Sequence, residues 1–130
     1  MDPALRLLVR ARADDRCEYC GLPQDLSELR FHVEHIVPRQ HGGDDDPNNL
    51  ALACPDCNLR KGPNLSAIDP ESQQVVRLFN PRRDSWATHF AFRGERIAGL
   101  TPTGRATANL LAVNEPERLR IRRVAKQVGR

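Results

Sequence analysis

The stretch CPDCNLRKG, residues 54–62, decides how this chain folds, because it combines two cysteines with the signals of a short helix. Pro55 stands where a first helical turn favours proline, and Gly62 stands where a helix ends. A second C-x-x-C pair lies earlier in the chain, within CEYC. Two such turns can direct four thiolates at one tetrahedral zinc ion. The sequence therefore predicts a structural zinc site on Cys17, Cys20, Cys54 and Cys57.

The same cysteines could instead form two disulfides or a redox-active dithiol. A reducing cytosol disfavours structural disulfides, and a redox C-x-x-C pair does not need a matching second pair. Residues 17–62 are also too few to bury much apolar surface, and a structural zinc adds about 10 kcal/mol of folding free energy to such modules. Zinc is therefore the favoured interpretation.

The composition is typical of one modest domain without a large cavity, since the chain is 39% hydrophobic and has one Trp, one Tyr and four Phe. No segment approaches the roughly 18 consecutive apolar residues of a membrane span, and the N-terminal stretch lacks a secretory core. We therefore expect a soluble, cytoplasmic protein with no membrane partner.

Charge is unevenly distributed along the chain. Residues 17–62 carry eight acidic and four basic side chains, whereas residues 115–130 carry two acidic and six basic ones. If the partner is a polyanion, bound metal must neutralise the acidic middle, while arginines outside it supply the long-range attraction.

The elements around the cysteines are expected in the order strand, loop, strand, helix. Asp2 and Pro3 predict the cap and first residue of an N-terminal helix that leads into the first cysteine pair. LRFHVEHIV, residues 29–37, reads as a strand, PRQHGGDDDPNN as a loop, and LALAC as a second, shorter strand. The helix that begins at Pro55 completes the unit.

Two oxygen donors in this frame suit a hard metal ion. The zinc site would fix the position of the helix. Asn58, on the first turn of that helix, would then lie near the strand that carries Glu34 and His35. A carboxylate and an amide oxygen form an incomplete shell for Mg²⁺, which keeps several waters and accepts phosphate oxygens. Neighbouring residues of a regular strand face opposite sides, so we expect irregular backbone near His35, where Pro38 indicates that pairing stops.

Over residues 17–62 the chain resembles the HNH endonuclease family, in the order and spacing of CEYC, HVEHIVPRQHGG, NNLALAC and CPDCNLRKG. The resemblance, to four-cysteine bacterial members, implies a ββα-metal finger. It places His35 as the general base, Asn49 as the asparagine that braces the loop, and Asn58 as a metal ligand, which makes an H-N-N variant. Glu34 stands where many members have aspartate.

The resemblance implies metal-dependent hydrolysis of DNA. Mg²⁺ or Mn²⁺ on Glu34 and Asn58 would bind the scissile phosphate and the leaving 3′ oxygen, while neutral His35 takes a proton from an in-line water. The expected products carry 5′-phosphate and 3′-hydroxyl ends. No base-reading helix is evident, so we expect weakly sequence-specific binding to duplex or structured DNA.

Other polar residues near the motif have two interpretations each. His41 either orients phosphate or is an exposed loop histidine, and His32 either supports the metal ligands or is an ordinary strand residue. Arg60 and Lys61 are further candidates for contact with the substrate or the metal ligands. The acidic run at residues 44–46 could supply metal ligands, but such a run is more often a solvated turn.

Residues 64–130 give weaker signals. They predict short strands in residues 73–80 and 89–100, helices from Pro102 and Pro116, and an aromatic cluster. His89 reads as structural. Apolar residues of the last helix, from Ile121 to Val128, share one face. A second face is either a phosphate-gripping row or a solvated one. Its residues are Arg118, Arg122 and Lys126.

The sequence thus predicts an α+β protein in which a zinc-stapled ββα-metal finger carries a C-terminal strand and helix extension. The expected parts are an N-terminal helix at 1–16, a nuclease core at 17–63, and an extension packed on it at 64–130. The competing hypothesis is a non-catalytic zinc module that binds nucleic acid or protein, and RNA as the substrate also stays open. The oligomeric state is not predicted.

Overall fold

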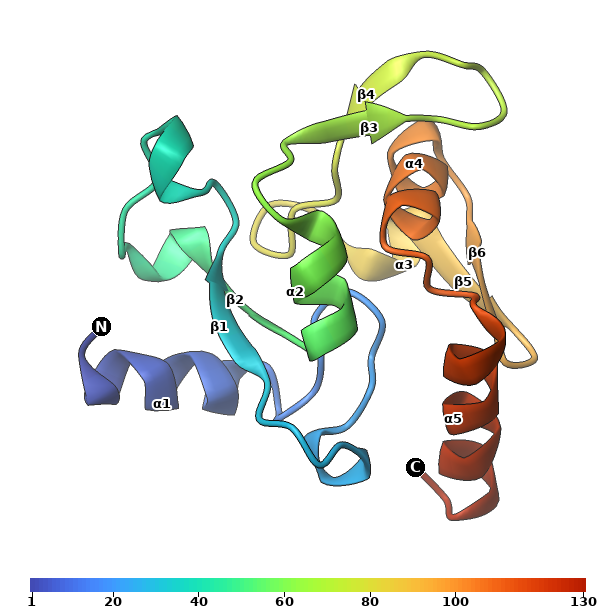
Figure 1. Cartoon of the computed structure of the whole chain (residues 1–130), viewed down its shortest axis with the longest axis horizontal. Helices are drawn as coiled ribbons and strands as arrows, with labels where there is room; N and C mark the ends of the chain where they lie inside the picture. Colours follow the sequence, from blue (N-terminus) through green and yellow to red (C-terminus); the bar gives the residue numbers. More distant parts are fainter. The chain divides into compact units, whose positions relative to one another are not determined.

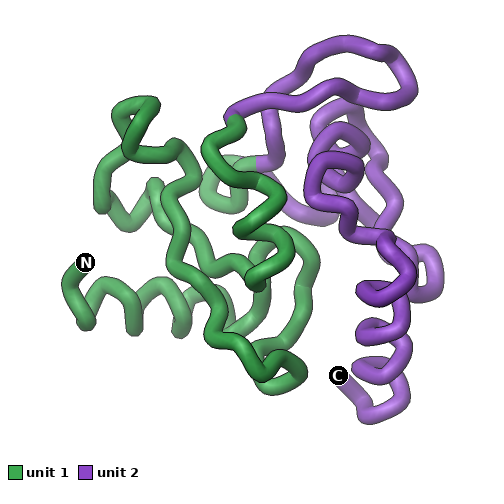
Figure 2. Tube along the Cα trace, in the orientation of Figure 1, with its two compact units in different colours: residues 1–64, 80–83 green, residues 65–79, 84–130 purple.

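The computed structural model describes residues 1–130 and divides into two compact units (Figures 1 and 2). Unit 1 comprises Met1–Asn64 and Asn80–Arg83, and unit 2 comprises Leu65–Phe79 and Asp84–Arg130. No helix in the chain combines the length and the apolar character that crossing a membrane requires.

Unit 1 is built around one antiparallel hairpin and the helix that follows it. Strand β1 (His32–His35) pairs with β2 (Leu50–Ala53), with His35 opposite Leu50, and α2 (Pro55–Lys61) starts two residues after β2. Helix α1 (Pro3–Arg12) precedes the hairpin, and three short 3₁₀ turns lie in the connections. This ββα order confirms the expected α+β fold class. The turns are η1 (Gln24–Leu26), η2 (Arg39–His41) and η3 (Pro47–Asn49).

Local signals in the sequence explain the helix boundaries in unit 1. The Asp2 carboxylate accepts a hydrogen bond from the Ala4 amide, 2.9 Å away, and thereby caps α1 as predicted. The Cys54 sulfur accepts from the Cys57 amide at the start of α2, and Gly62 ends that helix with a positive φ of 48°. Both helices therefore begin where the sequence indicates, and α2 also ends where Gly62 predicts, whereas α1 ends at Arg12, before the expected boundary at residue 16.

The hairpin of unit 1 is anchored to α1 by arginine side chains as well as by apolar contacts. All four residues of β2 are buried, as expected for an apolar run covered on both faces. Arg10 donates to the carbonyl of Phe31 and Arg12 to the carbonyl of Leu50, each at 2.8 Å. The backbone on either side of the hairpin is thereby tied to one helix.

Unit 2 contains two hairpins and three helices. Its apolar core includes Phe79, Phe90, Ile97, Leu111 and Val113. The strands expected in residues 73–80 and 89–100 and the helices at Pro102 and Pro116 are present, whereas β3 and α3, of three and four residues, were not anticipated. The elements are β3 (Ser66–Ile68) paired with β4 (Val75–Arg77), α3 (Trp86–His89), β5 (Phe90–Arg93) paired with β6 (Arg96–Gly99), α4 (Pro102–Leu110) and α5 (Pro116–Gln127).

The aromatic residues of unit 2 behave as predicted. Trp86 lies 5.2 Å from Phe90 and 5.1 Å from Phe92 between ring centroids, which confirms the expected cluster. His89 is buried, packs edge-on against Phe79 and bonds to the Thr101 hydroxyl at 2.6 Å. It is a structural residue.

The predicted basic row on α5 is wrong for two of its three members. Arg118 is buried and donates to the Leu111 carbonyl, while Arg122 donates to the carbonyls of Glu95 and Val113. Leu111 lies at the end of α4, where a helix leaves its last carbonyls without intrahelical partners. Backbone carbonyls thus bind both guanidinium groups, and neither side chain presents its charge to a ligand. The predicted apolar face is corrected too, because Val124 is exposed.

Candidate functional site

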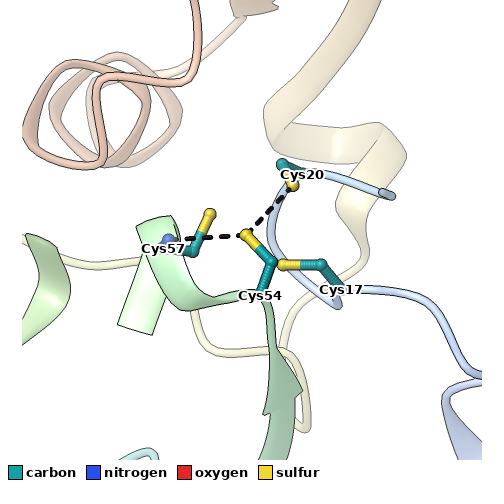
Figure 3. A group of neighbouring side chains, drawn as sticks. All are labelled: Cys17, Cys20, Cys54 and Cys57. Carbon is teal, nitrogen blue, oxygen red and sulfur yellow. Dashed lines mark hydrogen bonds between the residues drawn. The ribbon is translucent and has the colours of Figure 1, made fainter. Parts of the chain in front are cut away.

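The four cysteines of unit 1 converge on one point (Figure 3). Cys17 and Cys20 come from the turn after α1, Cys54 follows β2, and Cys57 lies in α2. Their sulfur atoms all lie within 4.8 Å of one another, and those of Cys20 and Cys54 are 3.8 Å apart. Sulfurs on a tetrahedral zinc at about 2.3 Å are separated by about 3.8 Å, whereas a disulfide requires about 2.05 Å.

Charge also indicates that this cluster holds a metal ion. All four thiols are buried and free of disulfides. Burial raises the pKa of Cys17 well above its ordinary value, and the neighbouring thiols raise the pKa of Cys57. Buried thiolates therefore need a cation, and four sulfur ligands are the shell that structural zinc sites use.

Glu34 and His35, at the end of β1, have different partners. The regular strand ends at His35 as expected, and the backbone bends at Ile36 and Val37. The Glu34 carboxylate is only 7% exposed and contacts residues of α2 and the first cysteine turn. His35 contacts the loop between the strands.

Both carboxylate oxygens of Glu34 are engaged. The Tyr19 hydroxyl donates to Oε1, and the Lys61 ammonium lies 3.2 Å from Oε2. Burial raises the pKa of Glu34, although Lys61 and Tyr19 act in the opposite direction. Burial and the nearby carboxylate also raise the pKa of Tyr19, so its hydroxyl keeps its proton.

Lys61 is the least expected member of this cluster, because lysine is rarely buried and this one is 2% exposed. Its ammonium donates to the carbonyls of Ile36 at 3.0 Å and His35 at 3.4 Å as well as contacting Glu34. Three partners for three N–H groups explain how the charge is tolerated. Lys61 thus joins α2 to the end of β1.

The Glu34 carboxylate and the Asn58 amide are suitable ligands for a hard ion, but the Lys61 ammonium already contacts Glu34. Asn58 is half-buried on α2 one turn before Lys61, on the same side of the helix. The Coulomb energy between an oxygen and a divalent ion about 2.1 Å away is roughly three times that between an oxygen and an ammonium at 3.2 Å. This ratio does not include the free energy that the ion loses when it gives up water ligands. Each Glu34 oxygen has a second lone pair to offer. A hard ion would use these oxygens in place of the Lys61 ammonium.

His35 forms a hydrogen bond with an acidic residue of the loop. Its Nε2 lies 2.7 Å from Oδ1 of Asp45, and Arg39 lies at the same distance from that oxygen. The hydrogen bond from His35, aided by Arg39, holds the pKa of Asp45 below its usual value. The His35 side chain is 19% exposed, so part of it reaches solvent.

Asn49 holds the loop that carries Asp45. Its Oδ1 accepts from the Val37 amide at 2.9 Å, and its Nδ2 donates to the carbonyls of Val37 and Asp44 at 3.0 and 2.9 Å. Gly43 is required beside it, because a Cβ there would lie 1.6 Å from the Val37 carbonyl oxygen. One amide thus joins the end of β1 to the acidic turn.

The remaining candidates lie at the surface. His32 is exposed at the start of β1, His41 is exposed in η2, and Arg60 is exposed on α2. The placement of His32 is that of an ordinary solvated strand residue.

Two contributors were missed in the sequence. Asp45 lay in an acidic run that reads as a solvated turn, and no local signal distinguished it from its neighbours. Tyr19 sits inside the first C-x-x-C pair, and a single tyrosine at this position carried no pattern either. Only the folded chain places these side chains next to His35 and Glu34.

Comparisons with known proteins match the segment that carries these residues. The family model for HNH endonuclease matches residues 17–64. Septu protein PtuB of Bacillus thuringiensis is 27% identical over 123 residues, which cover 90% of this chain and 44% of that protein. The chain thus spans less than half the length of this relative. No solved structure matches the chain. The family match contains the four cysteines and the hairpin described above, and over residues 17–64 the chain is therefore similar to the HNH endonuclease family.

Proposed function

We propose that unit 1 hydrolyses phosphodiester bonds of DNA, with His35 as the general base and a structural zinc on the four cysteines. A divalent ion, Mg²⁺ or Mn²⁺, would be held by Glu34 and Asn58. When bound, it supplies positive charge for the scissile phosphate and the departing 3′ oxygen.

His35 would remove the proton from the attacking water. Nε2 already bonds to Asp45, so Nδ1 is the nitrogen with a free lone pair. A positioned base of this kind contributes about 10²- to 10⁴-fold to the rate. Asn49 holds the loop that carries Asp45, and the exposed side chains of His41 and Arg60 would contact phosphates.

The observation that supports this proposal most is the pairing of His35 with a carboxylate on a braced loop, inside the segment that matches the HNH family. A carboxylate that accepts from Nε2 leaves the lone pair of a neutral ring on Nδ1, as a base requires. The proposed substrate class comes from the same family match.

A non-catalytic zinc module that binds nucleic acid or protein is favoured by one observation. Glu34 is buried and its charge is already compensated by Lys61. If Lys61 keeps this contact, the carboxylate holds α2 on β1 and no ion binds there.

A plasmid-nicking assay decides between these functions. Wild type, His35→Ala and His32→Ala are each incubated with supercoiled DNA in Mg²⁺, Mn²⁺ or chelator, after zinc content confirms folding. His32 has no role in the proposal and receives the same substitution on the same strand. We expect nicking by wild type and His32→Ala with divalent ion, and a loss of about 10²-fold or more in His35→Ala.

Two outcomes would contradict the nuclease proposal. Equal nicking by His35→Ala and wild type would remove His35 from the reaction. If wild type binds DNA but does not nick it in Mg²⁺ or Mn²⁺, the non-catalytic module is established instead.

A further inference from the structure

The contact between His35 and Asp45 determines which nitrogen of the imidazole carries the proton. Asp45 is ionised at neutral pH, because His35 and Arg39 both bond to its Oδ1. An ionised carboxylate only accepts hydrogen bonds, so the proton of this 2.7 Å bond is on Nε2. A neutral His35 then has its lone pair on Nδ1. The ring is held in the tautomer that can accept a proton from one defined side.

The backbone that carries Asp45 is held on both sides. Asp44, immediately before it, accepts from Asn49 through its carbonyl at 2.9 Å, and its carboxylate accepts from the Asp46 amide at 3.1 Å. Asp46, immediately after it, caps η3 by accepting from the Asn48 amide at 2.8 Å. Hydrogen bonds therefore restrain both neighbours of Asp45 and keep its backbone within reach of the ring.

Arg39 complements this arrangement from the solvent side. Its guanidinium lies 2.7 Å from the same Oδ1 but is 65% exposed, so water screens the pair. Arg39 thus helps keep Asp45 ionised, whereas the geometry of the ring depends on Asp45 itself.

We propose that Asp45 is a positioning residue for His35, fixing the orientation and tautomer of the imidazole so that Nδ1 can act as the base. This inference rests on the proposed function of His35 as a base and adds to it a residue that acts through the ring. In this proposal Asp45 acts through the His35 ring and is assigned no ligand or substrate contact of its own.

The test replaces Asp45 by asparagine, with Asp44→Asn as the matched control. In Asp45→Asn the new amide group can turn to donate to Nε2, which moves the ring proton to Nδ1 and blocks the base. Asp44→Asn removes the same charge from the same loop, but its side-chain carbonyl can still accept from the Asp46 amide. Steady-state nicking then yields kcat and KM, and ¹⁵N NMR of the histidine rings reports the tautomer.

We expect kcat to fall about 10²- to 10⁴-fold in Asp45→Asn, with KM within about threefold of wild type, because the base contributes that range. The ring spectrum of His35 should change from the Nε2–H to the Nδ1–H form. Asp44→Asn should retain the wild-type kcat and ring spectrum. In Asp45→Glu, a carboxylate that reaches Nε2 should restore the Nε2–H form and part of kcat.

The outcomes separate this proposal from the one on which it rests. If His35→Ala is inactive but Asp45→Asn keeps both the wild-type kcat and the Nε2–H form, Asp45 does not position the ring. If wild type itself does not nick DNA, the NMR arm still decides whether Asp45 sets the tautomer. Should Asp45→Asn lose its zinc or fold, the ring spectrum of Asp45→Glu decides: an Nδ1–H ring beside a reaching carboxylate would overturn the inference.

Discussion

Unit 1 contains a four-cysteine cluster beside its apolar core, whereas unit 2 has no cysteine and is held by aromatic and aliphatic packing together with buried polar side chains. In unit 1 the buried polar residues are Glu34 and Lys61, and the buried apolar residues include Phe31, Leu50 and the four cysteines. In unit 2, Phe79 and Phe90 pack edge-on, with ring centroids 5.2 Å apart. The four-cysteine cluster is therefore the feature that distinguishes unit 1.

The difference shows what it takes to hold reactive groups in a small module. Polar side chains at a site need fixed positions, but a short hairpin and one helix bury too little surface to hold them by packing. A metal ion and charge-assisted hydrogen bonds supply directional restraints instead. Unit 2 carries an ion pair with one buried member, Asp69, bonded to the half-buried Arg105, whereas both members of the Glu34–Lys61 pair are buried.

Removal of the metal should have the largest effect and should separate the two units. A strong zinc chelator, or Cys54→Ser, is expected to cost unit 1 about 10 kcal/mol and to unfold it. Unit 2 should keep its protected amides, because the four-cysteine cluster lies entirely in unit 1. Hydrogen exchange read by mass spectrometry measures both units at once. Unchanged protection in β1 and β2 after chelation would show that packing alone holds unit 1.

Loss of one partner of the buried ion pair should have the next largest effect. Lys61→Met leaves the Glu34 carboxylate buried and unpaired, and the expected cost is about 3–5 kcal/mol of unfolding free energy. The double variant Glu34→Gln with Lys61→Met should cost less than Lys61→Met alone. Urea unfolding of wild type, Glu34→Gln, Lys61→Met and the double variant gives the coupling energy between the two residues. Equal costs for the single and double variants would mean that the charge of Glu34 is not what Lys61 compensates.

Acid should weaken unit 2 through Asp69. The bond from Arg105, with help from Ser72, holds the pKa of Asp69 well below its usual value. A depressed pKa contributes stability that is full above the unfolded value near 3.9 and is lost as pH falls toward the folded one. Trp86, the single tryptophan, reports unit 2 by fluorescence.

The control for this prediction is Asp69→Asn. Urea midpoints of wild type should fall between about pH 5 and pH 2, and the variant should be less stable at pH 7 with a flatter dependence on pH. If the urea midpoint of Asp69→Asn falls with pH as steeply as that of wild type, other carboxylates cause the acid sensitivity.

The smallest effects should distinguish the inward and outward arginines of α5. Arg118→Gln removes a bond to the Leu111 carbonyl and should cost about 1–3 kcal/mol of stability. Arg120 is paired with Glu117 and its side chain is 68% exposed. Arg120→Gln should therefore lower the free energy of unfolding by less than about 0.5 kcal/mol. If α5 contacts DNA, Arg120→Gln should lower the salt slope of binding by about one, which fluorescence anisotropy can measure.

Local signals predicted the parts of the fold that local chemistry controls. The caps at Asp2 and Thr101 and the prolines that follow them start helices because they satisfy the first amides of each helix. The elements β3 and α3 escaped prediction because so few residues give no periodicity. The α5 arginines were placed outward because charge alone does not reveal which carbonyls lie within reach.

Spacing along the chain was enough to identify the four-cysteine site and the HNH motif, since turns of fixed length can bring four thiolates to one ion without any other contact. The engagement of Glu34 by Lys61 and Tyr19, and that of His35 by Asp45, depended on tertiary structure. These pairs come from different elements, and their geometry follows from how α2 and the loop dock on β1. No spacing rule covers such contacts, because burial and backbone partners, both absent from a linear sequence, decide where a charged side chain turns.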